Sequence, residues 1–235
     1  MTGLLDRAAA PLAPARRRRL LPVLAGALVL VVVLGWLVGF SSVFGVRTVT
    51  VAGEQRLSAA AIEQVAGIRH GAALARLDTG AIRERISGLP AVRSVSVHTS
   101  YPSTVRITVT ERVAVGYRSS ADGVVLVDPS DIQFATQRHA PAGLPQLELT
   151  GDQARSAAAA AVAGALPAGF ARVVSRISAP TPQTVTLTLT DGRTVLWGGT
   201  DRSAEKAALV PVLVHQPGTY FDVSDPSAVI SRGGN

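Results

Sequence analysis

The sequence predicts an α+β protein with a single transmembrane helix, a small β-α-α-β-β domain and a mostly antiparallel β domain with flanking helices. Three observations predict this class. An uncharged apolar segment follows a run of arginines, two helix signals with N-cap residues lie between residues 57 and 90, and apolar and polar residues alternate with period 2 at several places further on. The chain has 235 residues, and the pattern beyond the apolar segment favours two small domains over one large one.

The apolar segment is residues 20–40, LLPVLAGALVLVVVLGWLVGF, which holds 21 residues without a charge. At about 1.5 Å per residue, a helix of this length crosses a hydrocarbon core of about 30 Å. Four arginines at 16–19 precede it, and the next basic residue is Arg47. The positive-inside rule therefore predicts a cytoplasmic tail of residues 1–19 and a C-terminal part outside the membrane, the single-pass type II arrangement.

A cleaved signal peptide is the competing interpretation, since it too combines a basic start with an apolar centre. The apolar part of a signal peptide is usually about 7–15 residues long and ends at an A-x-A-like site. Here the run is longer, and the residues that follow it, SSVFGV, contain no such site. The sequence favours an uncleaved anchor.

Charge and cysteine content limit what the rest of the chain can do. The net charge is +7 for the whole chain but +3 beyond residue 40, where 18 basic and 15 acidic residues lie. This balance implies no nucleic-acid-binding patch. The chain has no cysteine, so the domains outside the membrane must be stable through packing alone.

The first domain is expected to begin with a strand at residues 46–51, which Gly53 ends. Ser58 suits the N-cap of a helix whose apolar face includes Ile62 and which stops at Gly67. Asp78 suits the N-cap of a second helix, which runs to Gly88. Each helix begins with the same device, a leucine just before the cap that can pack against an isoleucine in the first turns.

Residues 89–112, LPAVRSVSVHTSYPSTVRITVTER, predict a β-hairpin. Valine and isoleucine alternate with polar residues on both sides of a central segment, 99–103. Pro102 in that segment cannot donate to a strand ladder, so the turn is expected there. The order strand, helix, helix, strand, strand then allows two helices to cover one face of a three-stranded sheet.

The chain beyond residue 112 is expected to be mostly β. Strands are predicted at 124–127, 185–190 and 193–197 in one sheet, the last two joined by a two-residue hairpin at Asp191-Gly192. The alanine-rich residues 152–166 predict a surface helix. A second helix is expected over 202–214, with a kink or break at Pro211, and short strands at 219–223 and 228–232 follow.

No constellation for catalysis or metal binding stands out. The four histidines, His70, His98, His139 and His215, lack the spacing of metal ligands. The sequence has no G-x-S-x-G, P-loop or dinucleotide glycine motif. Carboxylates such as Asp128 and Asp222 fall where turns and strand ends need short polar side chains. We therefore expect no enzyme, no cofactor, no metal and no small-molecule substrate.

These residues carry a resemblance to a known family. The order β-α-α-β-β next to a membrane span resembles a POTRA domain, and four phrases are similar to the FtsQ/DivIB family of cell-division proteins: LPAV (89–92), SVSV (94–97), YPSTVRITVTER (101–112) and VLVD (125–128). The resemblance implies a POTRA domain over 44–112 and an FtsQ-type C-terminal β domain over 113–235. The chain departs from the family at Val113, where relatives often have proline, and in the turn after Asp128, where many have glycine.

The resemblance implies a bitopic membrane scaffold of the bacterial divisome, located in the cell membrane at the division septum. Such a scaffold recruits and positions septal cell-wall synthesis components through its extracytoplasmic domains. The partners implied are FtsB-like and FtsL-like bitopic division proteins and other divisome components. The alternative is a POTRA-type envelope protein-assembly or secretion factor, although such chains usually carry several POTRA repeats and a barrel.

The last strand is the expected partner site, because a sheet edge can accept a strand from another protein. The resemblance implies that the partner-binding residues are Tyr220, Asp222, Ala228, Val229, Ile230, Ser231 and Arg232. The alternative interpretation is structural. In that case Tyr220 and Val229 fill the core, and Arg232 is merely solvated.

Overall fold

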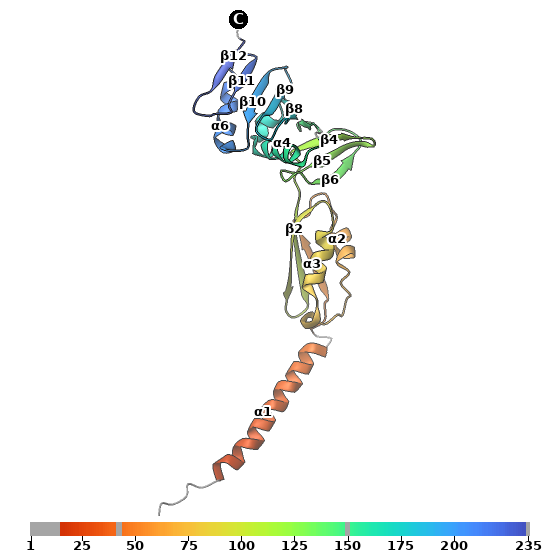
Figure 1. Cartoon of the computed structure of the whole chain (residues 1–235). Coiled ribbons are helices and arrows are strands. Elements are labelled where there is room, and N and C mark those ends of the chain that lie inside the picture. Colours follow the sequence, from red (N-terminus) through yellow and green to blue (C-terminus); the bar gives the residue numbers. More distant parts are fainter. Residues whose placement is uncertain (1–14, 41–43, 149–150, 234–235) are drawn as a thin grey trace, which may run out of the picture. The chain divides into compact units, whose positions relative to one another are not determined.

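The computed structural model describes residues 15–40, 44–148 and 151–233 (Figure 1); within helix α1 the side chains of residues 15–21, 23, 34 and 37–40 are not described. The chain divides into two compact units. The first consists of residues 1–52, 59–84 and 96–108, and the second of residues 53–58, 85–95 and 109–235. Each unit is described by itself.

Helix α1 spans Ala15–Phe40 and includes Pro22. Eight of its large apolar side chains are exposed by 46% to 66%: Leu24, Leu28, Val29, Leu30, Val31, Val32, Val33 and Trp36. Within the part of the chain that the structure describes, no helix was found that is long and apolar enough to cross a membrane. The predicted span over residues 20–40 is therefore not confirmed.

The expected order strand, helix, helix, strand, strand is confirmed. The elements are β1 (Thr48–Ala52), α2 (Ala59–Ala66), α3 (Thr79–Ser87), β2 (Val92–Ser100) and β3 (Thr104–Glu111), with a short 3-10 helix η2 (Leu74–Arg76) before α3. The strands form a sheet in the order β1-β3-β2, and β1 runs parallel to β3. The hairpin turn lies at residues 101–103, within the segment where Pro102 predicted it.

Local signals explain where these helices begin and what they bury. Asp78 Oδ1 accepts a hydrogen bond from the Ala81 N–H at 2.9 Å, the N-cap contact expected for α3. Gly67 follows α2 with φ of +62°, a conformation that glycine adopts at little cost. Both helices and the sheet contribute buried apolar side chains: Ile62 on α2, Ile82 and Ile86 on α3, and Val105 and Ile107 on β3.

The second unit is built on a nine-stranded sheet with the order β12-β11-β10-β9-β8-β7-β4-β5-β6. Its strands are β4 (Gly116–Ser120), β5 (Gly123–Val127), β6 (Gln133–Gln137), β7 (Gln146–Leu147), β8 (Val174–Ser178), β9 (Val185–Leu189), β10 (Thr194–Gly198), β11 (Tyr220–Asp222) and β12 (Ile230–Arg232). Five neighbouring pairs are antiparallel, while β4–β7, β7–β8 and β10–β11 are parallel. The sheet is therefore mostly antiparallel, as expected.

The two ends of this sheet differ in regularity. The pairing of edge strand β6 with β5 shifts register between Leu126 and Val127. At the other end, edge strand β12 pairs with β11 without a shift, from Tyr220 opposite Arg232 to Asp222 opposite Ile230. One edge is thus interrupted by an irregularity, and the other continues the sheet regularly.

The alanine-rich helix corrects one expectation. Helix α4 (Gln153–Ala165) is present, and Asp152 caps it through Oδ1, which accepts from the N–H groups of Ala154 and Arg155. It is a core helix and not a surface one, because Ala158, Ala159, Ala160, Val162 and Ala163 are buried. The small side chains let the helix contact strands β7, β8 and β9 closely.

The helix near the C-terminus corrects a second expectation, the break at Pro211. Helix α6 (Ser203–Leu213) includes Pro211, so the chain does not break at that residue. The helix ends two residues later, so Pro211 interrupts only its last turn, where few intrahelical hydrogen bonds remain to be lost. A short helix α5 (Ala168–Ala171), which the sequence did not predict, lies between α4 and β8.

Candidate functional site: a C-terminal edge strand

Strand β12 is the edge of the nine-stranded sheet, and all three of its residues are exposed. It pairs with β11 on one side, and β11 in turn runs parallel to β10. Two further contacts hold its end: the Thr219 N–H donates to the Arg232 carbonyl at 3.0 Å, and Ser231 Oγ donates to the Pro217 carbonyl at 3.2 Å. An edge strand presents unpaired backbone donors and acceptors on its outer side.

The structure places the seven predicted residues in different surroundings. Ile230, Ser231 and Arg232 form β12, and the Ile230 side chain is 43% exposed. The predicted strand began two residues earlier, but Ala228 and Val229 lie in the loop before β12. Val229 packs against the buried core, which agrees with the structural interpretation for that residue.

Tyr220 and Asp222 lie on β11 and are half-buried. Asp222 Oδ1 accepts from the Ser224 N–H at 2.9 Å and from Ser224 Oγ at 2.6 Å. This carboxylate is therefore already engaged in shaping the start of the β11–β12 loop. A second turn of the same kind follows, in which Asp225 Oδ1 accepts from the Ser227 N–H at 2.9 Å.

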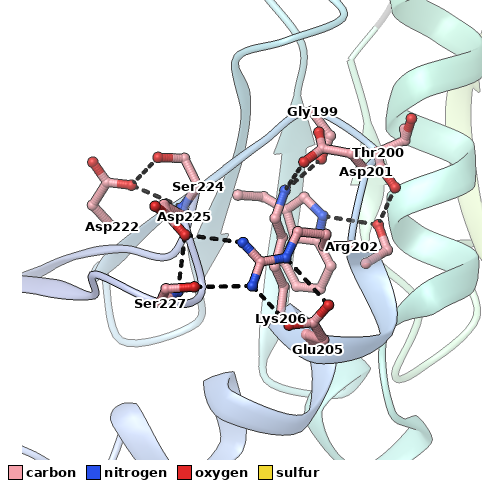
Figure 2. A network of polar contacts seen from close by, with 12 residues as sticks. Gly199, Thr200, Asp201, Arg202, Glu205, Lys206, Asp222, Ser224, Asp225 and Ser227 are labelled. Carbon is pink, nitrogen blue, oxygen red and sulfur yellow. Dashed lines mark hydrogen bonds and ion pairs between the residues drawn. The ribbon is translucent and has the colours of Figure 1, made fainter.

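The turn between β10 and α6 lies beside this loop and is fixed by three side chains (Figure 2). Lys206 is fully buried, and its Nζ donates to the Gly199 carbonyl at 3.0 Å and lies 3.7 Å from Asp201 Oδ2. Ser203 Oγ donates to the Thr200 carbonyl at 2.8 Å. It also accepts from the Trp197 indole N–H at 3.3 Å, so the turn is tied to the core.

Ser203 and Lys206 have the S-x-x-K spacing of some serine-nucleophile sites. In such a site the hydroxyl must face a base. Here the hydroxyl and the ammonium each donate to a backbone carbonyl of the turn. The geometry supports a structural role. Among the described residues, no group of three or more His, Asp or Glu side chains could hold a metal ion.

Arg202 joins this turn to the β11–β12 loop. Its Nε and Nη2 donate to the Glu205 carboxylate at 3.2 and 2.8 Å. Its Nη1 donates to Asp225 Oδ1 at 3.1 Å, and Nη2 also donates to Ser227 Oγ at 3.0 Å. Figure 2 shows the guanidinium between the helix and the loop. Arg202 adopts φ of +49°, a left-handed conformation that costs free energy in a residue with a Cβ.

The charges of this cluster support one another. The hydrogen bond from Arg202 holds the pKa of the Glu205 carboxyl below its ordinary value. The Ser227 backbone N–H does the same for the pKa of Asp225, helped by Ser227 Oγ and by Arg202. Carboxylates whose pKa is lowered by folding stabilise the fold at pH values above their ordinary pKa. This contribution is lost as the pH falls through the lowered pKa values.

Substituting Arg202 with asparagine is expected to loosen β12 while leaving the core intact. Asparagine tolerates the left-handed conformation but removes the guanidinium that holds Asp225 and Ser227. We expect amide hydrogen exchange in residues 224–232 to rise about fivefold, the effect of losing an exposed ion-pair network.

Arg155→Asn is the matched control for this substitution, because Arg155 pairs with Asp152 of its own helix cap, 3.7 Å away. It should leave exchange in residues 224–232 unchanged. Equal exchange in wild type and Arg202→Asn would contradict the role given to Arg202.

Arg202 was not among the predicted site residues. The only signal for it in the sequence was its position at the start of a predicted helix. Its partners in the β11–β12 loop, Asp225 and Ser227, are 23 and 25 residues further along the chain, a separation over which sequence patterns carry no information. A cavity of about 440 Å³ lies elsewhere in the second unit, beside the β9–β10 turn. None of the predicted residues lines it; it is lined in part by Phe170, Val173, Leu189, Arg193, Val214 and His215.

The motif residues Glu111 and Arg112 also have structural roles in the second unit. Glu111 Oε1 accepts from the N–H groups of Gln55, Arg56 and Leu57 at 2.8 to 3.1 Å. Arg112 Nη1 donates to Asp128 Oδ2 at 2.7 Å, and Asp128 is 1% exposed. Glu111 therefore organises backbone that lies 54 to 56 residues away in the sequence, and Arg112 pairs with the aspartate of VLVD; all three residues belong to the phrases that carried the family resemblance.

Comparison with known proteins agrees with this architecture. Residues 44–112 match the POTRA domain of FtsQ type, and residues 117–224 match the C-terminal domain of the cell division protein FtsQ/DivIB family. In the solved structures, the major extracytoplasmic domain of the DivIB division protein of Geobacillus stearothermophilus covers 45% of this chain and 92% of its own. Its TM-score of 0.36 at 18% identity is too low to support an argument.

Several cell division proteins named FtsQ are similar in sequence. The protein of Mycolicibacterium smegmatis is 39% identical over 201 residues, which cover 84% of this chain and 60% of that protein. The Mycobacteroides abscessus protein is 37% identical, with 82% and 63% covered, so the chain spans about three fifths of the length of these relatives. The Streptomyces collinus protein is 36% identical over 236 residues, which cover 93% of this chain and 89% of that protein. With two domain matches in order and a relative matched over most of its length, this chain belongs to the FtsQ family of cell division proteins.

Proposed function

We propose that this chain is a bitopic scaffold of the bacterial divisome, which recruits and positions septal cell-wall synthesis components through its extracytoplasmic domains. In this proposal residues 1–19 are a cytoplasmic tail, 20–40 the membrane anchor, 44–112 the POTRA domain and 113–235 the partner-binding β domain. The partners are FtsB-like and FtsL-like bitopic division proteins. The role is positional and involves no catalysis.

The anchor is supported by the sequence and by the surface of α1. Residues 20–40 contain no charge, and arginines precede them. The described apolar side chains of α1 are exposed along its length. Such a surface is stable in water only when something apolar covers it, and lipid provides that cover. The charge bias supports a cytoplasmic N-terminus and hence a type II membrane protein. Membership of the FtsQ family supports its location at the division septum.

The observation that carries the proposal is the regular, exposed edge of β12. A partner strand can pair with this edge through main-chain hydrogen bonds, which give affinity, while side chains on alternate positions give specificity. Ile230 offers an exposed apolar contact, and Arg232 offers a charge. Partners held in the same membrane meet this edge at high local concentration, so a short strand suffices.

In-cell photo-crosslinking tests the site directly. A photoreactive residue at Ile230 is expected to capture a small single-span division protein. Val229 is less suitable because it packs against the core. The same residue at Val212, which is 65% exposed on α6, serves as the control and should capture no such protein. Capture of barrel proteins or secreted clients from Ile230 would favour the assembly-factor alternative, and the absence of any capture would contradict the site.

Ser231→Pro is expected to weaken partner binding at least tenfold, because proline removes a backbone donor from a strand of three residues. Ser231→Ala is the matched control, since it removes only the hydroxyl that donates to Pro217. Affinity for the purified partner can be measured by titration calorimetry, with circular dichroism to show that the fold is retained. Equal affinities for the folded proline variant and wild type would rule out pairing at β12.

A further inference from the structure

Three segments of the first unit meet at the end of the sheet where the chain arrives from α1. The Val46 N–H donates to the Ala72 carbonyl at 2.9 Å, and the Gly71 N–H donates to the Val46 carbonyl at 2.8 Å. The Arg47 N–H donates to the Ser103 carbonyl in the hairpin turn at 2.8 Å. Residues 44–47, 67–73 and 100–103 therefore form one continuous surface, named here the basal surface.

An aromatic pair lies on the basal surface. The rings of Phe44 and Tyr101 meet edge to face, with centroids 6.2 Å apart and an interplanar angle of 67°. The Tyr101 side chain is 58% exposed, and the neighbouring Pro102 is exposed as well. An exposed tyrosine with an apolar body and a polar tip suits the boundary between lipid and water, where such side chains concentrate.

The charge of the basal surface has one sign. Its three segments contain Arg47, Arg69 and His70, all exposed, and no aspartate or glutamate. The chain beyond residue 40 is otherwise nearly balanced, so this local excess is not a consequence of overall composition. Basic side chains near a membrane bind the phosphates of anionic lipids.

The position of the basal surface along the chain identifies its partner. Phe44 follows Phe40, the last residue of α1, by four residues, which span at most about 14 Å when fully extended. We propose that the basal surface rests on the bilayer, with Tyr101 in the interface and Arg47 and Arg69 on the phosphates of anionic lipids. This inference rests on the proposed anchor, because residues 20–40 hold the surface within reach of the membrane.

The absence of cysteine allows a direct test on the full chain in lipid nanodiscs that contain phosphatidylglycerol. A single cysteine at Ser100, beside the intact aromatic pair, carries an environment-sensitive fluorophore. Lipids with a spin label near the headgroup are expected to quench it at least threefold more than a fluorophore at Thr108. Thr108 is the matched control because it is exposed on β3, roughly 13 Å further along the strand from Thr104.

Two variants test the named side chains. Tyr101→Ser, and separately Arg47→Gln with Arg69→Gln, should each reduce quenching at Ser100 at least twofold, and the arginine effect should vanish in discs without anionic lipid. Equal quenching at Ser100 and Thr108 would overturn the inference. A fluorophore at Leu30, quenched by a spin label deep in the acyl chains, reports on the anchor separately. No quenching at Leu30 would overturn the anchor and this inference together, whereas quenching at Leu30 alone would leave the anchor standing.

Discussion

Replacing Trp197 with alanine is expected to lower the free energy of unfolding by about 3–5 kcal/mol, a large share of the total stability of a typical domain. Trp197 lies on β10 and is fully buried in the core that joins the sheet to α4 and α6. Its removal leaves a cavity that rigid neighbouring strands cannot close. Its indole N–H also donates to Ser203 Oγ, so the turn that leads to Arg202 loses a contact with the core.

Urea unfolding followed by circular dichroism measures this effect without depending on tryptophan fluorescence. Trp197→Phe keeps most of the buried apolar volume and should cost clearly less than the alanine variant. Val212→Ala on α6 removes apolar atoms from a side chain that is 65% exposed and should change the free energy of unfolding by less than about 0.5 kcal/mol. A loss below about 1 kcal/mol for Trp197→Ala would mean that the core assigned to the second unit is wrong.

The second large effect is expected at Glu111. Burial raises the pKa of its carboxyl, but hydrogen bonds from the N–H groups of Gln55, Leu57 and Arg56 together outweigh burial and lower it. Glu111→Ala leaves these three donors without their acceptor and should lower the free energy of unfolding by about 3 kcal/mol. Glu111→Gln keeps one acceptor oxygen and loses the charge, so about 1–2 kcal/mol is expected.

The pH dependence of stability distinguishes the contribution of the Glu111 charge from the contribution of the shape of its side chain. A carboxyl whose pKa is lower in the folded than in the unfolded state stabilises the fold at pH values above its unfolded pKa, which is about 4.3 for glutamate. This stabilisation is lost as the pH falls through the folded pKa. Wild type and Glu111→Gln should therefore differ most near neutral pH and converge as the pH falls through the folded pKa of Glu111. Glu63→Gln, at an exposed position of α2, is the control and should match wild type throughout. A constant difference between wild type and Glu111→Gln across this range would show that the charge contributes nothing.

Elements with strong local signals could be predicted from the sequence. The first domain followed from N-cap residues, alternation and a turn proline, and the β9–β10 hairpin followed from Asp191-Gly192. Strands β4, β6, β7 and β8 were not predicted because they are short or lack clear alternation, and β7 consists of two residues. The burial of α4 was missed for a different reason: a run of alanines looks the same on every face, so the sequence does not show which face packs.

The candidate site could be predicted only in outline. A short edge strand over residues 228–232 was expected from the sequence, and its last three residues do form one. Its partner-binding role was implied only by the family resemblance. The supporting contacts could not be predicted, because Arg202, Asp225 and Ser227 come together only when the helix and the loop are folded. Lys206 likewise reads as an ordinary helix lysine in the sequence, and only the fold shows that it is fully buried beneath the turn.

The difference between the two ends of the nine-stranded sheet has a consequence for stoichiometry. A sheet with two regular edges could accept a strand at each end and so link molecules into open-ended assemblies. Here the register shift beside β6 interrupts one edge, as bulges do in sheets that resist edge-to-edge pairing, while β12 continues the sheet without interruption. In the proposed function, the nine-stranded sheet therefore offers one regular edge for strand addition, and one docked partner strand is expected for each copy of this chain.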